Sequence, residues 1–499
     1  MSDRSRSLPD QPNLRYLKIE AKRRLSAGEF PSLHDAQLAI AREHGLSSWA
    51  ALKATVEAAE ARFPALGHVR WVADRFAGAD DPGWAAPEGD ELRDHFDEHY
   101  LSLVPAQKLI GTLRSLAPRL RADLVVSHTT PLAVRAQIAD LRVEAAARPD
   151  PPHRLATLSV YPLGQRVTDP RTAAPATRSS TGAPARAVRV AEESFAELGL
   201  VGLALAGRDR DDETPLWTVV RGWAQLDRNE PLHADHRFPA YGVSKLVTST
   251  AVLRLVAEGR VDLDGPANAH LRTLRLDDGG VTVRELLTHT GGVVSPDERF
   301  ADAIIDPVAP LGHTVSCDNR RGSLVPSDGG YAVLGQLIAD VTGAPYPEAA
   351  AALVLEPTGM VGSWFPVRWP ENDAIGGHLL SGDGSFVGAP RQVCTLPAAG
   401  GLWSTAPDLV RFGLAWSSLL PDELVREALR PQVAQPSGAS VGLGWLINEA
   451  KDLYGHPGTG PGAAASLTIR LGTGAVTAVC TNRQVPIEPV NARLIRTAG

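Results

Sequence analysis

Residues 236–266, HRFPAYGVSKLVTSTAVLRLVAEGRVDLDGP, decide the fold of the C-terminal part of this 499-residue chain. The middle of this stretch, TSTAVLRLVA, is apolar and contains no proline, so it predicts a helix. Gly259 stands where this helix is expected to end, because glycine readily adopts the backbone conformation of a helix terminus. Two strands are predicted upstream, LVGLALAG (200–207) and LWTVVRGWAQLD (216–227), joined by the charged turn RDRDDET.

Five more segments follow downstream in a defined order, and they complete a pattern that begins with Phe238 and Lys245. They are VTVRELLTHTGGV (281–293), SDGGYAVLGQLIADVTG (327–343), PAAGGLWSTAPDLVRF (397–412), GLGW (442–445) and GHPGTGPG (455–462). Residues 191–499 thereby resemble class C serine β-lactamases, penicillin-binding proteins and related esterases. The resemblance implies a β-lactamase/transpeptidase-like fold, an antiparallel sheet flanked by helices with an added all-helical subdomain.

The first motif of this family is F-x-x-x-S-x-x-K at the start of a helix. Phe238 and Lys245 match it, but the position of the nucleophilic serine falls on Gly242. In the family a desolvated lysine near the serine acts as base, and the helix N-terminus stabilises negative charge. Glycine cannot form an acyl-enzyme, although its N–H could still bind a carbonyl oxygen. Ser244 is adjacent to Lys245 and is expected to project elsewhere on the helix.

The second motif, Tyr-Ser-Asn or Tyr-Ser-Asp before a Gly-Tyr pair, is also altered. Its tyrosine is replaced by Pro326, while Tyr331 matches the later tyrosine. In one interpretation, Ser327-Asp328-Gly329 imitates the Ser-Asp-Asn of class A enzymes and Ser327 supplies the catalytic hydroxyl. In the other, Ser327 caps a turn. Asp328 and Tyr331 are predicted to line the cleft.

The third motif is the HxG variant, His456-Pro457-Gly458. The resemblance places His456 and Gly458 in the wall opposite the nucleophile, and gives the Thr459 amide as second oxyanion donor. Tyr241 and Lys245 are four residues apart, so on one helix they would share a face and could perform acid–base chemistry without a covalent intermediate. The alternative is that Tyr241 is a core aromatic.

Three functional hypotheses follow. The first is a serine hydrolase, such as an esterase, amidase or transacylase in specialised metabolism, in which the serine was replaced by Gly242. The second is natural divergence towards a ligand-binding protein or a non-covalent enzyme that uses Lys245, Tyr241, Ser327 and His456. The third is an interaction protein that acts through its N-terminal parts. The segments 294–325 and 362–396 lie between the motifs and are expected to set specificity, with Trp364, Phe365 and Trp369 as candidate cleft residues.

The N-terminal half is predicted to contain two smaller domains, which make the chain an α+β multidomain protein. Residues 1–63 show helical periodicity with three helices ended or capped by Gly28, Ser32 and Gly45. Residues 64–165 combine two helix candidates with several alternating strands, a pattern that resembles cystatin-like or NTF2-like α+β domains. Residues 166–190, rich in Pro, Ala, Thr and Ser, are predicted to be a linker.

Composition indicates which classes of partner to expect. The formal net charge of −7 gives no reason to expect nucleic acid or an anionic membrane. The three cysteines form no CxxC pair, and the N-terminus lacks the apolar segment of a secretory signal, so a cytoplasmic protein is expected. No metal or cofactor motif is present in the sequence. The expected partner is a small-molecule substrate or ligand, whose identity the pattern leaves open together with the oligomeric state.

Overall fold

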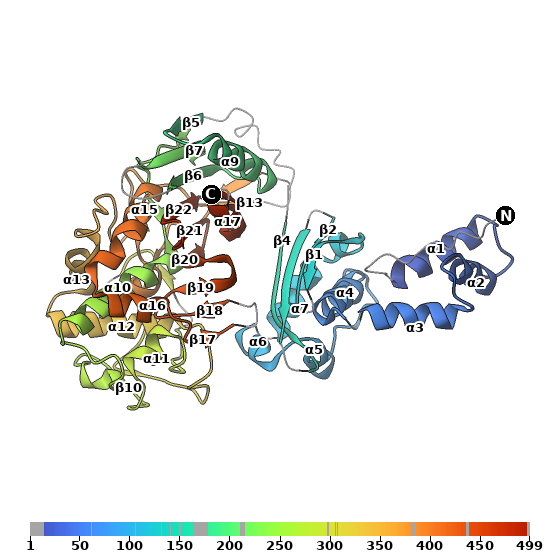
Figure 1. The fold of residues 1–499 in the computed structure, drawn as a ribbon, viewed down its shortest axis with the longest axis horizontal. Coiled ribbons are helices and arrows are strands. Elements are labelled where there is room, and N and C mark those ends of the chain that lie inside the picture. Colours follow the sequence, from blue (N-terminus) through green and yellow to red (C-terminus); the bar gives the residue numbers. More distant parts are fainter. Residues whose placement is uncertain are drawn as a thin grey trace. The chain divides into compact units, whose positions relative to one another are not determined.

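The fold is described from a computed structural model, whose chain divides into two compact units, residues 1–162 and 163–499. Figure 1 traces both units in sequence colours. The described residues are 14–60, 62–104, 106–130, 132–139, 141–148, 151–162, 178–209, 215–296, 299–304, 306, 308–380, 385–435 and 439–496.

The first unit begins with three helices, as the periodicity predicts. They are α1 (Leu14–Ser26), α2 (Leu33–Glu43) and α3 (Trp49–Glu60). Ser32 caps α2, since its side chain accepts a hydrogen bond from the Asp35 N–H. Their buried residues, among them Leu17, Ile40 and Leu52, form a small hydrophobic cluster of their own.

The rest of the first unit is a four-stranded antiparallel sheet in the order β1-β2-β3-β4, with helices against it. Its elements are α4 (Pro64–Phe76), α5 (Gly89–His95), α6 (Glu98–Leu103), α7 (Ala106–Ser115), α8 (Ala117–Leu120), β1 (Leu124–Thr130), β2 (Ala133–Ile138), β3 (Leu141–Ala147) and β4 (Leu155–Pro162). Helix α4, which sequence patterning did not single out, packs against β1, β2 and β3. The comparison with cystatin-like and NTF2-like domains stays a prediction.

The described part of the predicted linker, residues 178–190, is built into the second unit. Residues 163–177 lie outside the described residues, but β5 (Arg178–Thr181) pairs with β7 (Trp217–Gln225) and α9 (Ala185–Glu197) follows at once. The small residues of this segment suggested a linker. One of them, Ala187, is in fact fully buried against the sheet.

The second unit is built on a ten-stranded antiparallel sheet in the order β17-β18-β19-β20-β21-β22-β6-β7-β5, with β8 paired to β7. Figure 1 shows these strands following one another across the unit. Their bounds are β6 (Gly202–Arg208), β8 (Glu230–Pro231), β17 (Val433–Ala434), β18 (Ser440–Val441), β19 (Leu446–Asn448), β20 (Leu453–Gly460), β21 (Ala463–Arg470) and β22 (Ala475–Thr481).

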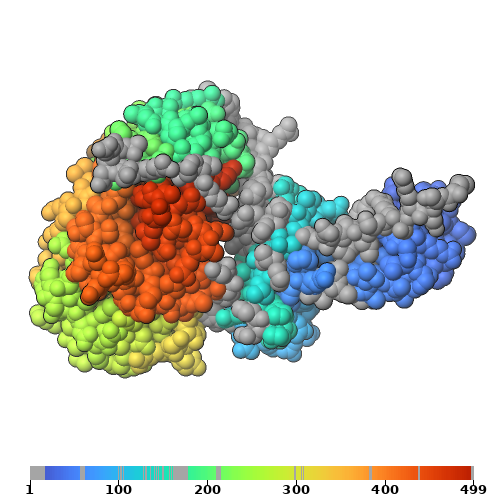
Figure 2. Space-filling model, viewed as in Figure 1, coloured from blue at the N-terminus to red at the C-terminus, as the bar shows by residue number. Residues whose placement is uncertain are grey.

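Alternation along the strands directs side chains to two different cores. Leu203 and Leu205 of β6 pack with α9 and α17 (Glu488–Arg496), whereas Ala204 and Ala206 face the larger core of the helical side. On the face shown in Figure 2, this unit contains green residues near position 200 and red residues of the last strands, which are far apart in sequence.

The helical side contains the elements that position the site. They are α10 (Ser244–Ala257), α11 (Val283–Leu287), α12 (Asp328–Thr342), α13 (Tyr346–Ala350), α14 (Pro397–Gly400), α15 (Ala406–Ala415) and α16 (Asp422–Leu429). Short strand pairs connect them: β9 (Phe238–Pro239) with β16 (Trp403–Ser404), β10 (Arg275–Leu276) with β12 (Thr314–Val315), β11 (Phe300–Ala301) with β15 (Val393–Cys394), and β13 (His378–Leu380) with β14 (Phe386–Gly388). The predicted sheet with flanking helices and a helical subdomain is confirmed. None of the helices in the described ranges is both long and apolar enough to cross a membrane.

Candidate active site

The nucleophile position lies in a tight turn rather than in the helix. Residues Tyr241–Val243 form a 3₁₀ turn, and α10 begins only at Ser244. Tyr241 has φ +44°, a conformation that is uncommon for residues other than glycine, so the turn is held in place by its surroundings.

Strand β20 packs against this turn at a distance that only glycine permits. A Cβ atom on Gly458 would lie 2.0 Å from the Ala240 carbonyl oxygen, and one on Gly460 would lie 2.5 Å from the Tyr241 ring. The first half of β20 pairs with β19, but from His456 onward its only sheet partner among the described strands is β21. The free side of the HxG segment is therefore covered by the nucleophile turn.

Gly242 has no space for a side chain. A Cβ atom there would lie 2.6 Å from the carbonyl oxygen of Pro457 and 3.0 Å from Cε1 of His456. The first obstacle is backbone, which cannot rotate away as a side chain could. The site is thus closed at the point where the serine of the family motif would stand.

Lys245 points to the N-terminus of α12 and not to a nucleophile. Its Nζ donates to Oδ1 of Asp328 at 2.8 Å and to the Ala399 carbonyl at 3.2 Å, and the residue is only 7% exposed. Arg299 donates to the other carboxylate oxygen of Asp328 at 2.6 Å. These three side chains form what we call the lysine cluster: Lys245, Asp328 and Arg299.

Charge in the lysine cluster keeps Asp328 ionised. Burial alone would raise the pKa of its carboxyl, but the Lys245 ammonium and the Arg299 guanidinium together outweigh burial and lower the pKa to about 2. The carboxylate also stands at the first position of α12, where the helix dipole favours negative charge. Lys245 is therefore held as the counter-ion of a carboxylate.

Ser327 is a helix cap. Its Oγ donates to the Val293 carbonyl at 2.7 Å and accepts from the Gly330 N–H at 3.0 Å, and it precedes the first residue of α12. The structure therefore corresponds to the second interpretation of this motif, a capping serine. Pro326, at the position of the family tyrosine, is exposed.

His289 binds the backbone of this cap, and Tyr331 packs against the His289 ring. The Ser327 N–H donates to Nδ1 of His289 at 3.0 Å, and Tyr331, fully buried, donates its hydroxyl to the Leu287 carbonyl at 2.9 Å. Burial and the nearby Lys245 charge lower the pKa of His289 to about 3, so its ring is neutral. Tyr331, predicted to line the cleft, instead contacts Lys245 only through its ring face, 5.6 Å from Nζ.

Tyr241 does not share a helix face with Lys245. Because the turn precedes α10, the four-residue spacing that predicted a pair does not apply. The Tyr241 hydroxyl donates to the Pro461 carbonyl at 2.9 Å, and burial raises its pKa far above the usual range. Ser244 projects elsewhere, as predicted, and accepts from the Leu402 N–H at 3.0 Å.

His456 lies against Gly242, but its ring is engaged by its own strand. Nδ1 is 2.5 Å from the Pro457 carbonyl oxygen, which requires the proton to be on Nδ1. Burial and the Lys245 charge lower the pKa of His456 to about 3. Gly458 is buried beneath the turn, while Thr459 is exposed on the same strand.

Sequence reasoning missed Arg299 and the Pro457 carbonyl. Arg299 lies in one of the segments expected to set specificity, yet no local pattern distinguishes it from other loop arginines. Of the three aromatic candidates, Phe365 is buried in a cavity wall, whereas Trp364 and Trp369 pack on Trp403. No group of three or more His, Cys, Asp or Glu side chains within the described ranges is arranged to hold a metal ion.

The sequence model of the Beta-lactamase family matches residues 187–499. The chain belongs to this family. Esterase EstB of Burkholderia gladioli is 30% identical over 313 residues, covering 52% of this chain and 79% of the esterase. The putative penicillin-binding protein PbpX of Bacillus subtilis strain 168 is 24% identical over 283 residues, 53% of this chain and 66% of that protein.

Two solved structures share the fold of the second unit. A penicillin-binding protein from Bacillus halodurans superimposes with a TM-score of 0.54 at 21% identity, over 62% of this chain and 99% of that one. The D-amino acid amidase of Ochrobactrum anthropi SV3 does so with a TM-score of 0.52 at 24% identity, over 60% and 92% of the two chains. At these identities the likeness concerns the fold alone.

Proposed function

We propose that this member of the Beta-lactamase family binds a small-molecule ligand and forms no acyl-enzyme. The observation that carries the proposal is the position of the Pro457 carbonyl oxygen, 2.6 Å from where a Cβ atom of Gly242 would stand. If a serine had been replaced in an otherwise active enzyme, space for its side chain would be expected to remain. The absence of that space supports natural divergence over an introduced replacement.

Loss of the other catalytic elements accompanies the loss of the nucleophile. A lysine base must reach a neutral state, but Lys245 is paired at 2.8 Å with a carboxylate whose pKa is about 2. The Ser327 hydroxyl already donates to a backbone carbonyl. Neither group is free to carry a proton between a nucleophile and a leaving group.

A non-covalent acid–base reaction has less support. Tyr241 donates its hydroxyl to a carbonyl, and a histidine with a pKa of about 3, as in His456, is a weak base at neutral pH. Interaction through the N-terminal parts has no specific observation in its favour. Binding without turnover is therefore the function that the site supports best.

The lysine cluster favours a ligand with an anionic group. Two cationic side chains share a single carboxylate, and the Arg299 side chain is 49% exposed. A ligand carboxylate near Arg299 would compensate the second cation. Arg299→Gln is therefore expected to weaken such binding, while Arg430→Gln, at the exposed C-cap of α16, serves as matched control.

Mass spectrometry of the intact protein tests the proposal. The chain is incubated with a fluorophosphonate probe and, separately, with benzylpenicillin, and its mass is compared with that of untreated protein. We expect no added mass from either reagent. A stoichiometric adduct on a residue of the second unit, Ser244 and Ser327 included, would overturn the proposal.

A further inference from the structure

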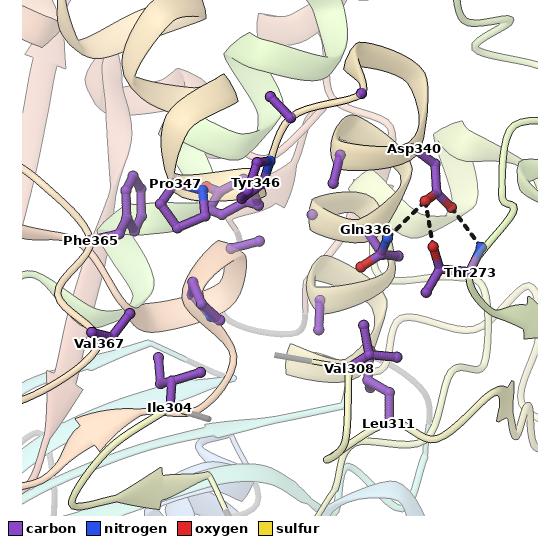
Figure 3. Close-up of a pocket in the computed structure, with 18 of the residues that line it drawn as sticks. Thr273, Ile304, Val308, Leu311, Gln336, Asp340, Tyr346, Pro347, Phe365 and Val367 are labelled. Atoms are coloured by element: carbon purple, nitrogen blue, oxygen red, sulfur yellow. Dashed lines mark hydrogen bonds between the residues drawn. The ribbon is translucent and has the colours of Figure 1, made fainter. Parts of the chain in front are cut away.

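A cavity of about 590 Å³ lies along one face of α12, on the side of α14 away from Gly242. Figure 3 shows it between α12 and the segments that carry Ile304, Val308, Phe365 and Val367. Its volume falls in the range of cavities that hold small organic ligands, roughly 300–1,000 Å³. The cavity is separate from the lysine cluster, although the two are close: Ala398 lines the cavity, and the next carbonyl along α14 binds Lys245.

The two long segments between the family motifs build the apolar walls. Ile304, Val308 and Leu311 come from the first segment, and Phe365 and Val367 come from the second. The Ile304 N–H donates to the Val367 carbonyl at 2.8 Å, so the two segments are joined at the cavity wall. The parts of the sequence without motif character therefore meet at one place.

Neighbouring contacts hold the walls apart. The Tyr346 hydroxyl shares a 2.7 Å hydrogen bond with Thr248 of α10, which anchors the aromatic ring in the upper wall of Figure 3. Gly335 of α12 packs so closely on α14 that a Cβ atom would lie 2.5 Å from the Ala398 side chain. With α12 fixed to α14 and α13 fixed to α10, the cavity is built into the helical core.

One end of the cavity is polar and is lined by Arg272, Thr273, Gln336 and Asp340. Asp340 accepts hydrogen bonds from the Arg272 N–H at 2.6 Å, the Thr273 N–H at 3.0 Å and the Thr273 hydroxyl at 2.7 Å. Its fourth donor is Nε2 of Gln336, at 2.8 Å. Because an ionised carboxylate only accepts, the Gln336 amide nitrogen must face Asp340, and its oxygen then points into the cavity, as Figure 3 shows.

We propose that this cavity binds a neutral, mainly apolar small molecule with one hydroxyl or uncharged N–H donor at its end. The aliphatic and aromatic walls take the apolar body, and Oε1 of Gln336 accepts the hydrogen bond of the donor. The walls are apolar, and Asp340 already accepts four hydrogen bonds, so a cationic ligand would find no free carboxylate oxygen there. The inference does not rest on the proposed function of the Gly242 site and would survive its failure.

Calorimetric titration of the full chain with two matched probes tests the site. 4-Butylphenol carries a hydroxyl donor, whereas 4-butylanisole has nearly the same shape and no donor. We expect both to bind, with the phenol about threefold to tenfold tighter, the contribution of one net hydrogen bond. Equal affinities, or no heat from either probe up to its solubility limit, would overturn the proposal.

Three variants locate the binding. Ala339→Trp places a large side chain in the cavity from α12 and is expected to abolish binding of both probes, while Ala257→Trp, at the exposed end of α10, leaves binding unchanged. Gln336→Leu is expected to keep 4-butylanisole binding and to remove the preference for the phenol. Undiminished binding to folded Ala339→Trp, or a retained preference for the phenol in Gln336→Leu, would contradict the assignment. If Ala339→Trp does not fold, Gln336→Leu alone tests the assignment.

Discussion

The two sides of α14 differ in how tightly they are packed. On one side lie the family motifs, with Gly242, Lys245 and His456 brought together but packed so tightly that no side chain fits at the nucleophile position. On the other side lies a cavity of about 590 Å³, built mainly from segments without any motif. On the first side the motif residues are packed and ion-paired, whereas on the second the motif helices α12 and α14 meet segments without motif character around an open volume.

The largest expected loss of stability comes from breaking the ion pair on the packed side of α14. Asp328→Ala leaves the Lys245 ammonium buried without its carboxylate, and we expect the free energy of unfolding to fall by about 3 kcal/mol, the lower end for breaking a buried pair because Asp328 is partly exposed. Urea denaturation of the second unit measures this loss. Asp264→Ala is the matched control, since the Asp264 side chain is 70% exposed and Arg284 keeps Glu427 as a partner, so its loss should cost less than about 1 kcal/mol.

The double variant Lys245→Met/Asp328→Ala sharpens this result. Removing both charges abolishes the uncompensated ammonium, so the double variant should be more stable than Asp328→Ala alone. A double variant that is less stable than the single one would show that the pair is not the reason for the loss.

The next effect tests the closed turn. Gly242→Ser forces a Cβ atom against the Pro457 carbonyl and is expected to cost roughly 1–3 kcal/mol of stability, as overpacking of a core does. Gly388→Ser is the control, because a Cβ atom there meets no atom within 4 Å. Equal unfolding midpoints for the two variants would mean that the turn opens without cost.

A third effect depends on pH. His289 has a folded-state pKa of about 3, below the ordinary value of 6.5, so the unfolded chain binds the proton more readily between these values. Its contribution to stability is complete above pH 6.5 and is lost as the pH falls towards 3, by about 1 kcal/mol per pH unit. His289→Asn keeps an acceptor for the Ser327 N–H and tolerates the φ of +59° at this position. We expect its stability to fall less steeply than that of the wild type between pH 6.5 and 5; parallel slopes would contradict the assignment.

The smallest effect concerns the cap. Ser327→Ala removes the acceptor for the Gly330 N–H and is expected to cost about 1 kcal/mol of stability. If Ser327 had a catalytic role, its removal would instead change turnover without affecting the unfolding midpoint. Thermal unfolding of the variant distinguishes the two.

Much of the fold could be predicted from local sequence. The strands over 200–207 and 216–227 and the helix that ends before Gly259 are confirmed, because apolar periodicity and glycine placement act within a few residues. Helix α4 was not predicted, although its buried Leu66, Val69, Ala73 and Phe76 recur at helical spacing. The strand at Arg178–Thr181 was missed because its residues are small and polar, and only pairing with β7 makes it a strand.

The site was predicted less well because its chemistry depends on contacts between distant segments. The order of the motifs predicts that Lys245 and His456 lie near one another, but it leaves the role of Ser327 open between a catalytic hydroxyl and a cap. That Lys245 pairs with Asp328 follows from α12 meeting α10, and that Tyr241 turns to Pro461 follows from a turn with positive φ. Neither can be read from spacing, since spacing assumes that the helix begins before Tyr241.

Covalent labelling of Gly242→Ser tests the central claim most directly, that the site has closed around an absent side chain. The folded variant is treated with a fluorophosphonate probe, and the adduct is located by peptide mass spectrometry, with Gly388→Ser treated in parallel. The closed turn predicts no adduct at position 242 and the same background in both variants. Stoichiometric labelling at position 242, in a protein as stable as the wild type, would show that the catalytic geometry is intact and contradict the account.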